Sequence, residues 1–171
     1  MATIPEILLI EDDADDRELF AAALQASGVR ATLTCAGDAA EAVLRLNRMG
    51  RFAETPLPSL VVLDLGLPGL QGGTLLQVIR NAYGPRSIPV VVLTGSYRSA
   101  DRTECESWGI SDYLIKPNSY PDQVRLVSSL RRWLTPNPDT TPARFQQPPP
   151  QPGTGIHAMV RPQPPTGREQ R

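Results

Sequence analysis

The sequence of 171 residues contains no apolar run that approaches the roughly 18 residues of a membrane-spanning helix. Its first residues, MATIPE, include no basic segment followed by an apolar stretch, so we expect no secretory signal. The formal net charge of −1 gives no general attraction to nucleic acid or to an anionic membrane. We therefore expect a cytoplasmic protein that binds neither nucleic acid nor a membrane.

Cysteine and histidine are also scarce. Cys35 and Cys105 fit no metal-binding or redox spacing, and we interpret them as packed thiols in a reducing compartment. The single histidine, His157, lies near the C-terminus. Residues 1–134 therefore contain no histidine for a catalytic triad or for a histidine-rich zinc site.

Lysine is the rarest basic residue. Of 17 basic residues, Lys116 is the only lysine and the other 16 are arginine. A preference for arginine codons explains the sixteen arginines but does not explain the one exception. Lys116 is therefore a candidate functional residue.

Apolar residues along the sequence predict an alternation of strands and helices. Five apolar segments read as strands, and each is followed by a helical pattern: strands 7–10, 31–35, 60–64, 88–94 and 112–117; helices 15–27, 38–49, 72–82, 98–108 and 121–134. Asp38, with Glu41 three residues later, indicates a capping box, and Gly28 and Gly109 indicate helix ends. Continuously apolar strands that alternate with helices predict an α/β fold, in which helices cover both faces of a parallel sheet.

The composition changes after Leu134. Residues 135–171 contain ten prolines in 37 residues and few side chains that could form a core. Such a segment cannot bury enough surface to offset the entropy lost on ordering. We predict a folded domain over residues 1–134 and a disordered, proline-rich tail over residues 135–171.

Charged and polar residues follow four of the predicted strands. Glu11, Asp12 and Asp13 follow the first, Asp64 ends the third, Thr94 ends the fourth, and Lys116 ends the fifth. Ligands of open parallel sheets bind at the carboxyl ends of the strands, so we expect these side chains to converge. Each residue also has a simpler interpretation: Asp15 or Asp16 as a turn residue or helix cap, Thr94 as an ordinary strand residue, and Lys116 as a solvated side chain.

The convergent set suggests phosphoryl chemistry. Clustered carboxylates suit Mg²⁺, which takes few protein ligands and retains waters. Asp64 stands alone at a central strand end and is the candidate nucleophile, forming an aspartyl phosphate. Lys116 and Thr94 could then contact phosphoryl oxygens as a point charge and as a hydrogen-bond donor.

Four segments together resemble the receiver domain of response regulators in two-component signalling: ILLIEDD, LVVLDLGLPGLQG, IPVVVLTGS and SDYLIKP. The resemblance covers about residues 5–134. It implies a flavodoxin-like, doubly wound, five-stranded parallel sheet with strand order 2-1-3-4-5. The start ILLIEDDADDREL and the length of the connection 50–59 are similar to single-domain regulators that pair with phytochrome-type or other hybrid sensor kinases.

The resemblance also implies residue roles. Asp64 accepts the phosphoryl group from a histidine kinase, and Asp12 binds Mg²⁺ directly, whereas Glu11 acts through water. The backbone carbonyl of Gly66 completes the protein ligands. The roles implied for the remaining positions are phosphoryl contact by Thr94 and Lys116, an aromatic switch at Tyr113, and a cis peptide bond before Pro117.

Three positions depart from what is usual in that family. Gly66 and Ser96 occupy positions linked to phosphoryl lifetime, and Gly66 has no side chain there. Trp108, where small residues are more usual, is interpreted either as core or edge packing or as a partner contact. The lifetime is therefore not predicted.

No DNA-binding output segment is recognisable, so the expected partners are proteins. They are a histidine kinase acting in trans, a downstream protein or a histidine phosphotransfer protein, and a second copy bound through the fourth helix, fifth strand and fifth helix. We expect self-catalysed phosphoryl transfer rather than a conventional enzyme. The alternatives are a pseudo-receiver that binds proteins without phosphorylation and a haloacid-dehalogenase-like phosphotransferase, which needs an acid where Gly66 stands.

Overall fold

The computed structural model describes residues 4–68 and 72–134, and the predicted tail lies outside these residues. The five strands are β1 (Glu6–Ile10), β2 (Thr32–Ala36), β3 (Leu60–Leu63), β4 (Val90–Thr94) and β5 (Asp112–Ile115). The helices are α1 (Ala14–Ala26), α2 (Ala39–Leu46), α3 (Gly72–Ala82), α4 (Ser99–Ser107), α5 (Tyr120–Ser129) and α6 (Arg131–Leu134), with a 3₁₀ helix η1 (Gly50–Phe52). None of these helices has the length and hydropathy of a membrane span.

The strands form one parallel sheet of order β2-β1-β3-β4-β5, which confirms the predicted fold class and strand order. β1, β3 and β4 lie inside the sheet, and their side chains are almost all buried. This burial explains why their sequences are continuously apolar rather than alternating.

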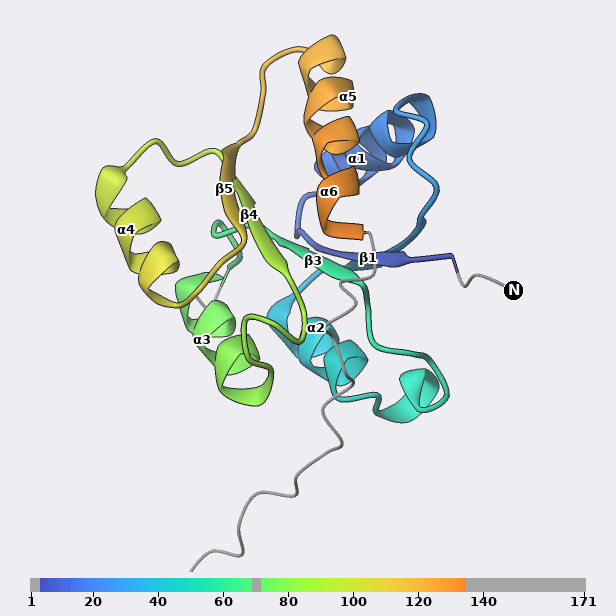
Figure 1. Cartoon of the computed structure of the whole chain (residues 1–171), viewed down its shortest axis with the longest axis vertical. Helices are drawn as coiled ribbons and strands as arrows, with labels where there is room; N and C mark the ends of the chain where they lie inside the picture. The colour runs from blue at the N-terminus through green and yellow to red at the C-terminus, as the bar shows by residue number, and fades with distance from the viewer. Residues whose placement is uncertain (1–3, 69–71, 135–171) are drawn as a thin grey trace, which may run out of the picture.

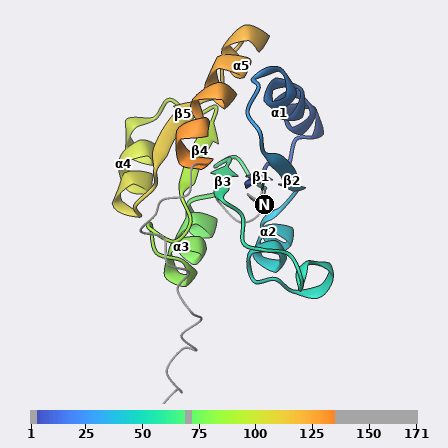
Figure 2. The same ribbon diagram turned by 45° about the vertical axis from the view of Figure 1, so that its right-hand side comes forward.

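Helices cover both faces of the sheet. Leu8 and Ile10 of β1 point to a cluster that includes side chains of α2, α3 and α4. Ile7 and Leu9 point to the opposite cluster, with side chains of α1, α5 and α6. Figure 1 shows α1 beside α5 on one side of the sheet and α2 and α3 on the other. Figure 2 shows the same separation from a second direction.

Local chemistry sets the helix boundaries. Asp13 caps α1, since its carboxylate accepts the backbone N–H groups of Asp15 and Asp16. The interpretation of Asp15 or Asp16 as a turn residue or helix cap was wrong, because both lie within the first turn of α1, after the Asp13 cap. Asp38 caps α2 as predicted, although Glu41 reaches back to the N–H of Gly37 rather than to that of Asp38.

Several predicted elements are shorter than expected. α2 ends before Met49 because Arg48 adopts a φ of 56°. β4 begins at Val90, after Pro89, a residue that has no N–H to donate to a neighbouring strand. Gly28 and Gly109, at φ of 66° and 74°, end α1 and α4 as predicted.

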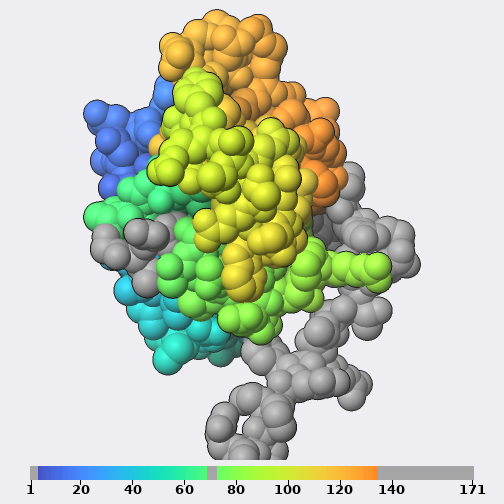
Figure 3. Space-filling view, turned by 90° about the vertical axis from the view of Figure 1, so that its left-hand side faces the viewer, coloured from blue at the N-terminus to red at the C-terminus, as the bar shows by residue number. Residues whose placement is uncertain are grey.

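α4 and β5 form one flank of the molecule. Figure 3 shows α4 on this face, with α3 below it and α5 above it. Trp108 follows α4 and packs, partly buried, against the core cluster of that sheet face. The packing interpretation of Trp108 is therefore confirmed.

Candidate functional site

The sheet brings the predicted site residues to one edge. Backbone hydrogen bonds continue one residue beyond the strands: Glu11 N donates to Ala36 O at 3.0 Å, Asp64 N to Ile10 O at 3.0 Å, and Lys116 N to Thr94 O at 2.9 Å. These three candidate site residues are therefore held in the register of the sheet. Rigid backbone placement of this kind keeps their side chains in defined positions.

Lys116 connects the acidic residues of this edge. Its Nζ lies 2.7 Å from Glu11 Oε2, 2.7 Å from Asp16 Oδ2 and 2.9 Å from Asp64 Oδ2. Burial by itself would lower the pKa of Lys116, but the hydrogen bonds to Asp16, Glu11 and Asp64 outweigh it and raise the pKa above its ordinary value. Lys116 is therefore a permanent cation at neutral pH, not a solvated surface lysine.

Glu11 is the most deeply placed of these acids. Its side chain is only 4% exposed, and burial raises the pKa of its carboxyl group, an effect that the hydrogen bond from Lys116 partly offsets. The charge of Asp64 raises the same pKa further. The second oxygen, Oε1, accepts the backbone N–H of Asp13 at 3.2 Å, so both Glu11 oxygens have donors.

Glu11, Asp12 and Asp64 form the candidate metal centre. One oxygen from each lies within 4.8 Å of the others, and Asp12 is exposed whereas Glu11 and Asp64 are buried. An all-carboxylate set open to solvent fits a hard divalent cation that retains waters. The donor chemistry therefore agrees with the Mg²⁺ prediction.

Gly66 lies directly beside Asp64. Its backbone N–H donates to Asp64 Oδ1 at 3.1 Å. A Cβ atom at position 66 would lie 3.3 Å from Asp64 Oδ2, closer than ordinary van der Waals contact. The absence of a side chain here therefore leaves the Asp64 carboxylate uncrowded on this side.

A hydrogen-bonded chain links Thr94 to Tyr113. The buried Thr94 hydroxyl accepts the N–H of Ser96 at 3.2 Å, and Ser96 Oγ donates to Asp101 Oδ2 at 2.6 Å. The Tyr113 hydroxyl donates to the Ser96 carbonyl at 3.2 Å, and its side chain is buried. The loop after β4 is thus tied both to α4 and to β5.

The cis prediction at Pro117 was wrong. Every peptide bond in the described parts of the chain is trans, and this includes the bond between Lys116 and Pro117. Trans is the intrinsically favoured isomer before proline, by roughly 0.5–1 kcal/mol, and the Lys-Pro dipeptide alone does not reverse this preference.

Sequence reasoning missed two residues of the site. Asp16, interpreted as a possible cap, instead contacts Lys116 from the first turn of α1. Arg17 Nη1 donates to the backbone carbonyls of Glu11 at 2.8 Å and Asp12 at 2.7 Å, and so holds the loop that carries two candidate metal ligands. The high density of charged residues around Asp12 was the available signal, but it did not specify which of these side chains face the site.

Comparisons with known proteins agree with this geometry. The family described as "Response regulator receiver domain" matches residues 7–130. Response regulator Rcp1 of Synechocystis sp. is 32% identical over 129 residues, which cover 75% of this chain and 88% of that protein. A probable methanogenesis regulatory protein, FilR2, of Methanothrix harundinacea is 36% identical over 138 residues, which cover 80% of this chain and 88% of that protein.

Solved structures of two response regulators superpose on this chain. The phosphorylated cyanobacterial phytochrome response regulator RcpA superposes with a TM-score of 0.70 at 28% identity, covering 77% of this chain and 94% of that chain. The Mn²⁺-bound form of Rcp1 superposes with a TM-score of 0.68 at 31% identity, covering 77% of this chain and 96% of that chain.

Proposed function

The chain belongs to the response regulator receiver domain family of two-component signalling, and from this premise we propose that Asp64 accepts a phosphoryl group from a histidine kinase. One observation carries the proposal. The buried Asp64 carboxylate lies between the Lys116 ammonium, at 2.9 Å, and the Gly66 N–H, at 3.1 Å, next to two further carboxylates. Lys116 donates to Oδ2 and Gly66 to Oδ1, so both oxygens of the carboxylate are held in place for in-line phosphoryl transfer.

The transfer exchanges one bond to phosphorus for another. A carboxylate oxygen of Asp64 forms a P–O bond while the P–N bond to the donor histidine breaks, and the electron pair of that bond returns to the imidazole nitrogen. Residues 1–134 contain no histidine, so the donor imidazole comes from a partner protein. The reaction leaves a mixed anhydride on Asp64, which water later hydrolyses.

Glu11, Asp12 and Asp64, with the backbone carbonyl of Gly66, are the residues that would hold Mg²⁺. When bound, the ion neutralises charge that develops on the phosphoryl oxygens. Lys116 holds the Asp64 carboxylate in position before transfer, and Arg17 holds the Glu11–Asp12 backbone. Thr94 lies at the end of the neighbouring strand, from where its hydroxyl can donate to a phosphoryl oxygen.

Phosphorylation then shifts a conformational equilibrium. The phosphoryl group adds up to two negative charges beside Lys116. A pair of charges ~4 Å apart is worth about 4 kcal/mol at an effective dielectric constant of 20, and a shift from 1:99 to 99:1 needs roughly 5.5 kcal/mol. The modification is thus of the right size to move Thr94, the Ser96 loop and the aromatic switch Tyr113 together.

The output is a protein contact. The flank formed by α4, β5 and α5 contains Tyr113. Both Thr94 and Tyr113 are hydrogen-bonded to Ser96, so a change at Thr94 alters this surface. It binds a downstream protein, a histidine phosphotransfer protein or a second copy of the chain. The relatives Rcp1 and RcpA, the latter named as a phytochrome response regulator, support a phytochrome-type or hybrid kinase as the cytoplasmic donor.

The test is phosphorylation by acetyl phosphate, with and without Mg²⁺, read by intact mass. Wild type should gain one phosphoryl group only with Mg²⁺, and Asp64→Asn should gain none. Asp15→Asn, which removes an exposed aspartate from the first turn of α1, is the matched control and should behave as wild type. Binding of Mg²⁺ without modification by acetyl phosphate or by any of a panel of histidine kinases would favour the pseudo-receiver alternative.

A further inference from the structure

The ammonium group of Lys116 is saturated with acceptors. It carries three N–H donors, and three carboxylate oxygens lie within 2.9 Å of Nζ. One acceptor comes from each of Glu11, Asp16 and Asp64. A phosphoryl oxygen therefore cannot be added to this arrangement unless Lys116 releases one of the three carboxylates.

The three acceptors differ in how easily they can be released. The Glu11 side chain is 4% exposed, so a Glu11 carboxylate without Lys116 would be a buried charge with almost no access to water, which is costly. Asp64 receives the phosphoryl group and stays at the centre of the reaction. The Asp16 side chain is 41% exposed, so water can replace Lys116 as its partner.

The space around Asp16 supports this exchange. A small cavity of about 30 Å³ lies beside Lys116 and is lined by Asp16, Glu11 and Gln123, among others. A cavity of this size can hold a water molecule, and its polar lining residues come from α1, from α5 and from the ends of β1 and β5. Asp16 can therefore be hydrated at this position after Lys116 has turned toward another acceptor.

We propose that Asp16 is a positioning residue that competes with the phosphoryl group for Lys116. This competition limits how tightly the Asp64 site holds the phosphoryl group. This inference rests on the proposed phosphorylation of Asp64. In the unphosphorylated protein Asp16 keeps the ammonium between α1 and β5. On phosphorylation Lys116 leaves Asp16 and donates to a phosphoryl oxygen.

The test uses beryllofluoride, formed from beryllium and fluoride, as a non-covalent probe of the phosphoryl-bound state. Its binding is titrated by ¹⁹F NMR at a Mg²⁺ concentration shown to saturate each variant. Asp16→Asn should bind the probe about threefold to tenfold more tightly than wild type, because Lys116 is no longer held by a competing anion.

Two variants separate this role from a general charge effect. Asp15→Asn removes the same charge one residue away, from an exposed side chain, and should leave beryllofluoride affinity within a factor of two. Asp16→Glu keeps a carboxylate within reach of Lys116 and should restore an affinity close to that of wild type. Circular dichroism and the midpoint of urea unfolding show whether each variant is folded.

A spectroscopic signature tests the contact itself. Because the chain has one lysine, selective ¹⁵N labelling of lysine side chains gives a single Nζ resonance. In the free protein, Asp16→Asn should shift this resonance, and Asp15→Asn should not. With beryllofluoride bound, wild type and Asp16→Asn should show the same Nζ shift, because Lys116 has left Asp16 in both.

The outcomes are separable. If wild type and Asp15→Asn bind beryllofluoride but Asp16→Asn binds it no more tightly, the competition is refuted and the proposed function stands. An Nζ resonance that still differs between wild type and Asp16→Asn in the bound state also contradicts the inference. If wild type with saturating Mg²⁺ neither binds the probe nor gains a phosphoryl group, the proposed function fails, and this inference fails with it.

Discussion

The hydroxyl group of Tyr113 donates a hydrogen bond of 3.2 Å to the backbone carbonyl of Ser96. The contact joins β5 to the loop after β4, and the same loop is bound to α4 through Ser96 Oγ and Asp101. The ring lies among buried core residues, with the Arg102 guanidinium 5.7 Å from its centroid. The position of this loop and that of the ring are therefore physically coupled.

Tyr113→Phe removes the hydroxyl group and leaves the ring in place. We expect the free energy of unfolding to fall by about 1 kcal/mol, the usual net value of one such hydrogen bond. Amide hydrogen exchange in the Ser96 loop should accelerate, because one of the side-chain hydrogen bonds that hold the loop is lost. Urea unfolding and hydrogen-exchange mass spectrometry measure the two effects.

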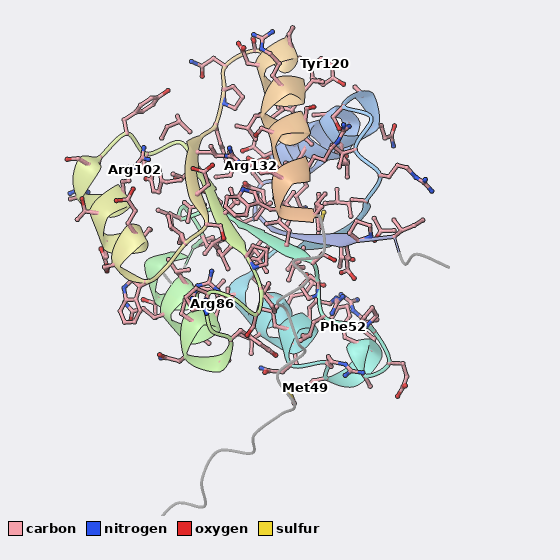
Figure 4. The ribbon with its side chains drawn as sticks, viewed as in Figure 1. Met49, Phe52, Arg86, Arg102, Tyr120 and Arg132 are labelled. Carbon is pink, nitrogen blue, oxygen red and sulfur yellow. The ribbon has the colours of Figure 1, made fainter. Side chains whose placement is uncertain are left out.

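Tyr120→Phe is the matched control, since Tyr120 is a 45% exposed tyrosine at the start of α5 (Figure 4). It should change neither the unfolding midpoint nor exchange in the loop. Equal effects of the two substitutions would show that the Tyr113–Ser96 bond does not hold the loop.

A buried ion pair lies at the opposite end of the sheet, where the strand β1 begins. Arg45 Nη2 donates to the two carboxylate oxygens of Glu6, at 2.6 and 2.5 Å, and to the Pro56 carbonyl at 2.9 Å. Arg45→Met leaves the Glu6 carboxylate, only 13% exposed, without its cation. We expect a loss of about 3–5 kcal/mol in the free energy of unfolding, measured in urea.

Arg51→Met provides the comparison, because the Arg51 side chain is 71% exposed in its ion pair with Glu41. This substitution should cost less than about 1 kcal/mol. The prediction for Arg45 would be wrong if the two substitutions cost the same.

Mg²⁺ should raise the thermal stability of the protein, and EDTA should reverse the effect. A ligand that binds only the folded state stabilises it by about 1.4 kcal/mol at ten times its dissociation constant. Asp12→Asn should abolish most of this increase and should change the metal-free stability little, because Asp12 is exposed. Asp15→Asn should keep the increase, and its loss there would point to nonspecific charge screening.

The two cysteines should react at different rates. Burial, with the nearby acids Glu104, Asp101 and Glu106, raises the pKa of Cys105 to about 11, so at pH 8 only about one thousandth is thiolate. Cys35 is only half-buried, and iodoacetamide at pH 8 should modify it first. Mass spectrometry after digestion distinguishes the sites, and in urea both should react alike.

The raised pKa of Cys105 also makes the stability of the protein depend on pH. The unfolded chain loses the Cys105 proton near its ordinary pKa of 9.0, whereas the folded chain keeps it up to about pH 11. Stability from this group is therefore complete below pH 9 and is lost as pH rises toward 11. Cys105→Ala should decline less over this range than wild type, and parallel curves would contradict the assignment.

The sequence was sufficient to predict the sheet because burial controls its pattern. Interior strands are apolar on both faces, and their ends are marked by polar residues whose positions the parallel topology then brings together. Glu11, Asp12, Asp64, Thr94 and Lys116 could be grouped on this basis alone. The role of Asp12 as a direct metal ligand and that of Tyr113 as an aromatic switch, by contrast, came from resemblance to a family.

The contacts of Asp16 could not be predicted because they depend on helix phase. Neighbouring helical residues point about 100° apart, so the residue at which α1 begins decides whether Asp15 or Asp16 faces Lys116. That start is set by Asp13, one of several acids able to act as the cap. An error of one residue in a helix boundary is therefore enough to misassign a site residue.

The Glu6–Arg45 pair and the acidic site lie at opposite ends of β1. Four residue-to-residue steps of extended chain lead from Glu6 to Ile10, a span of about 13 Å, and Glu11 follows. Sites this far apart, with no shared partner, usually contribute additively to the free energy of unfolding. One end of the sheet can therefore be redesigned for greater robustness without retuning the signalling chemistry at the other.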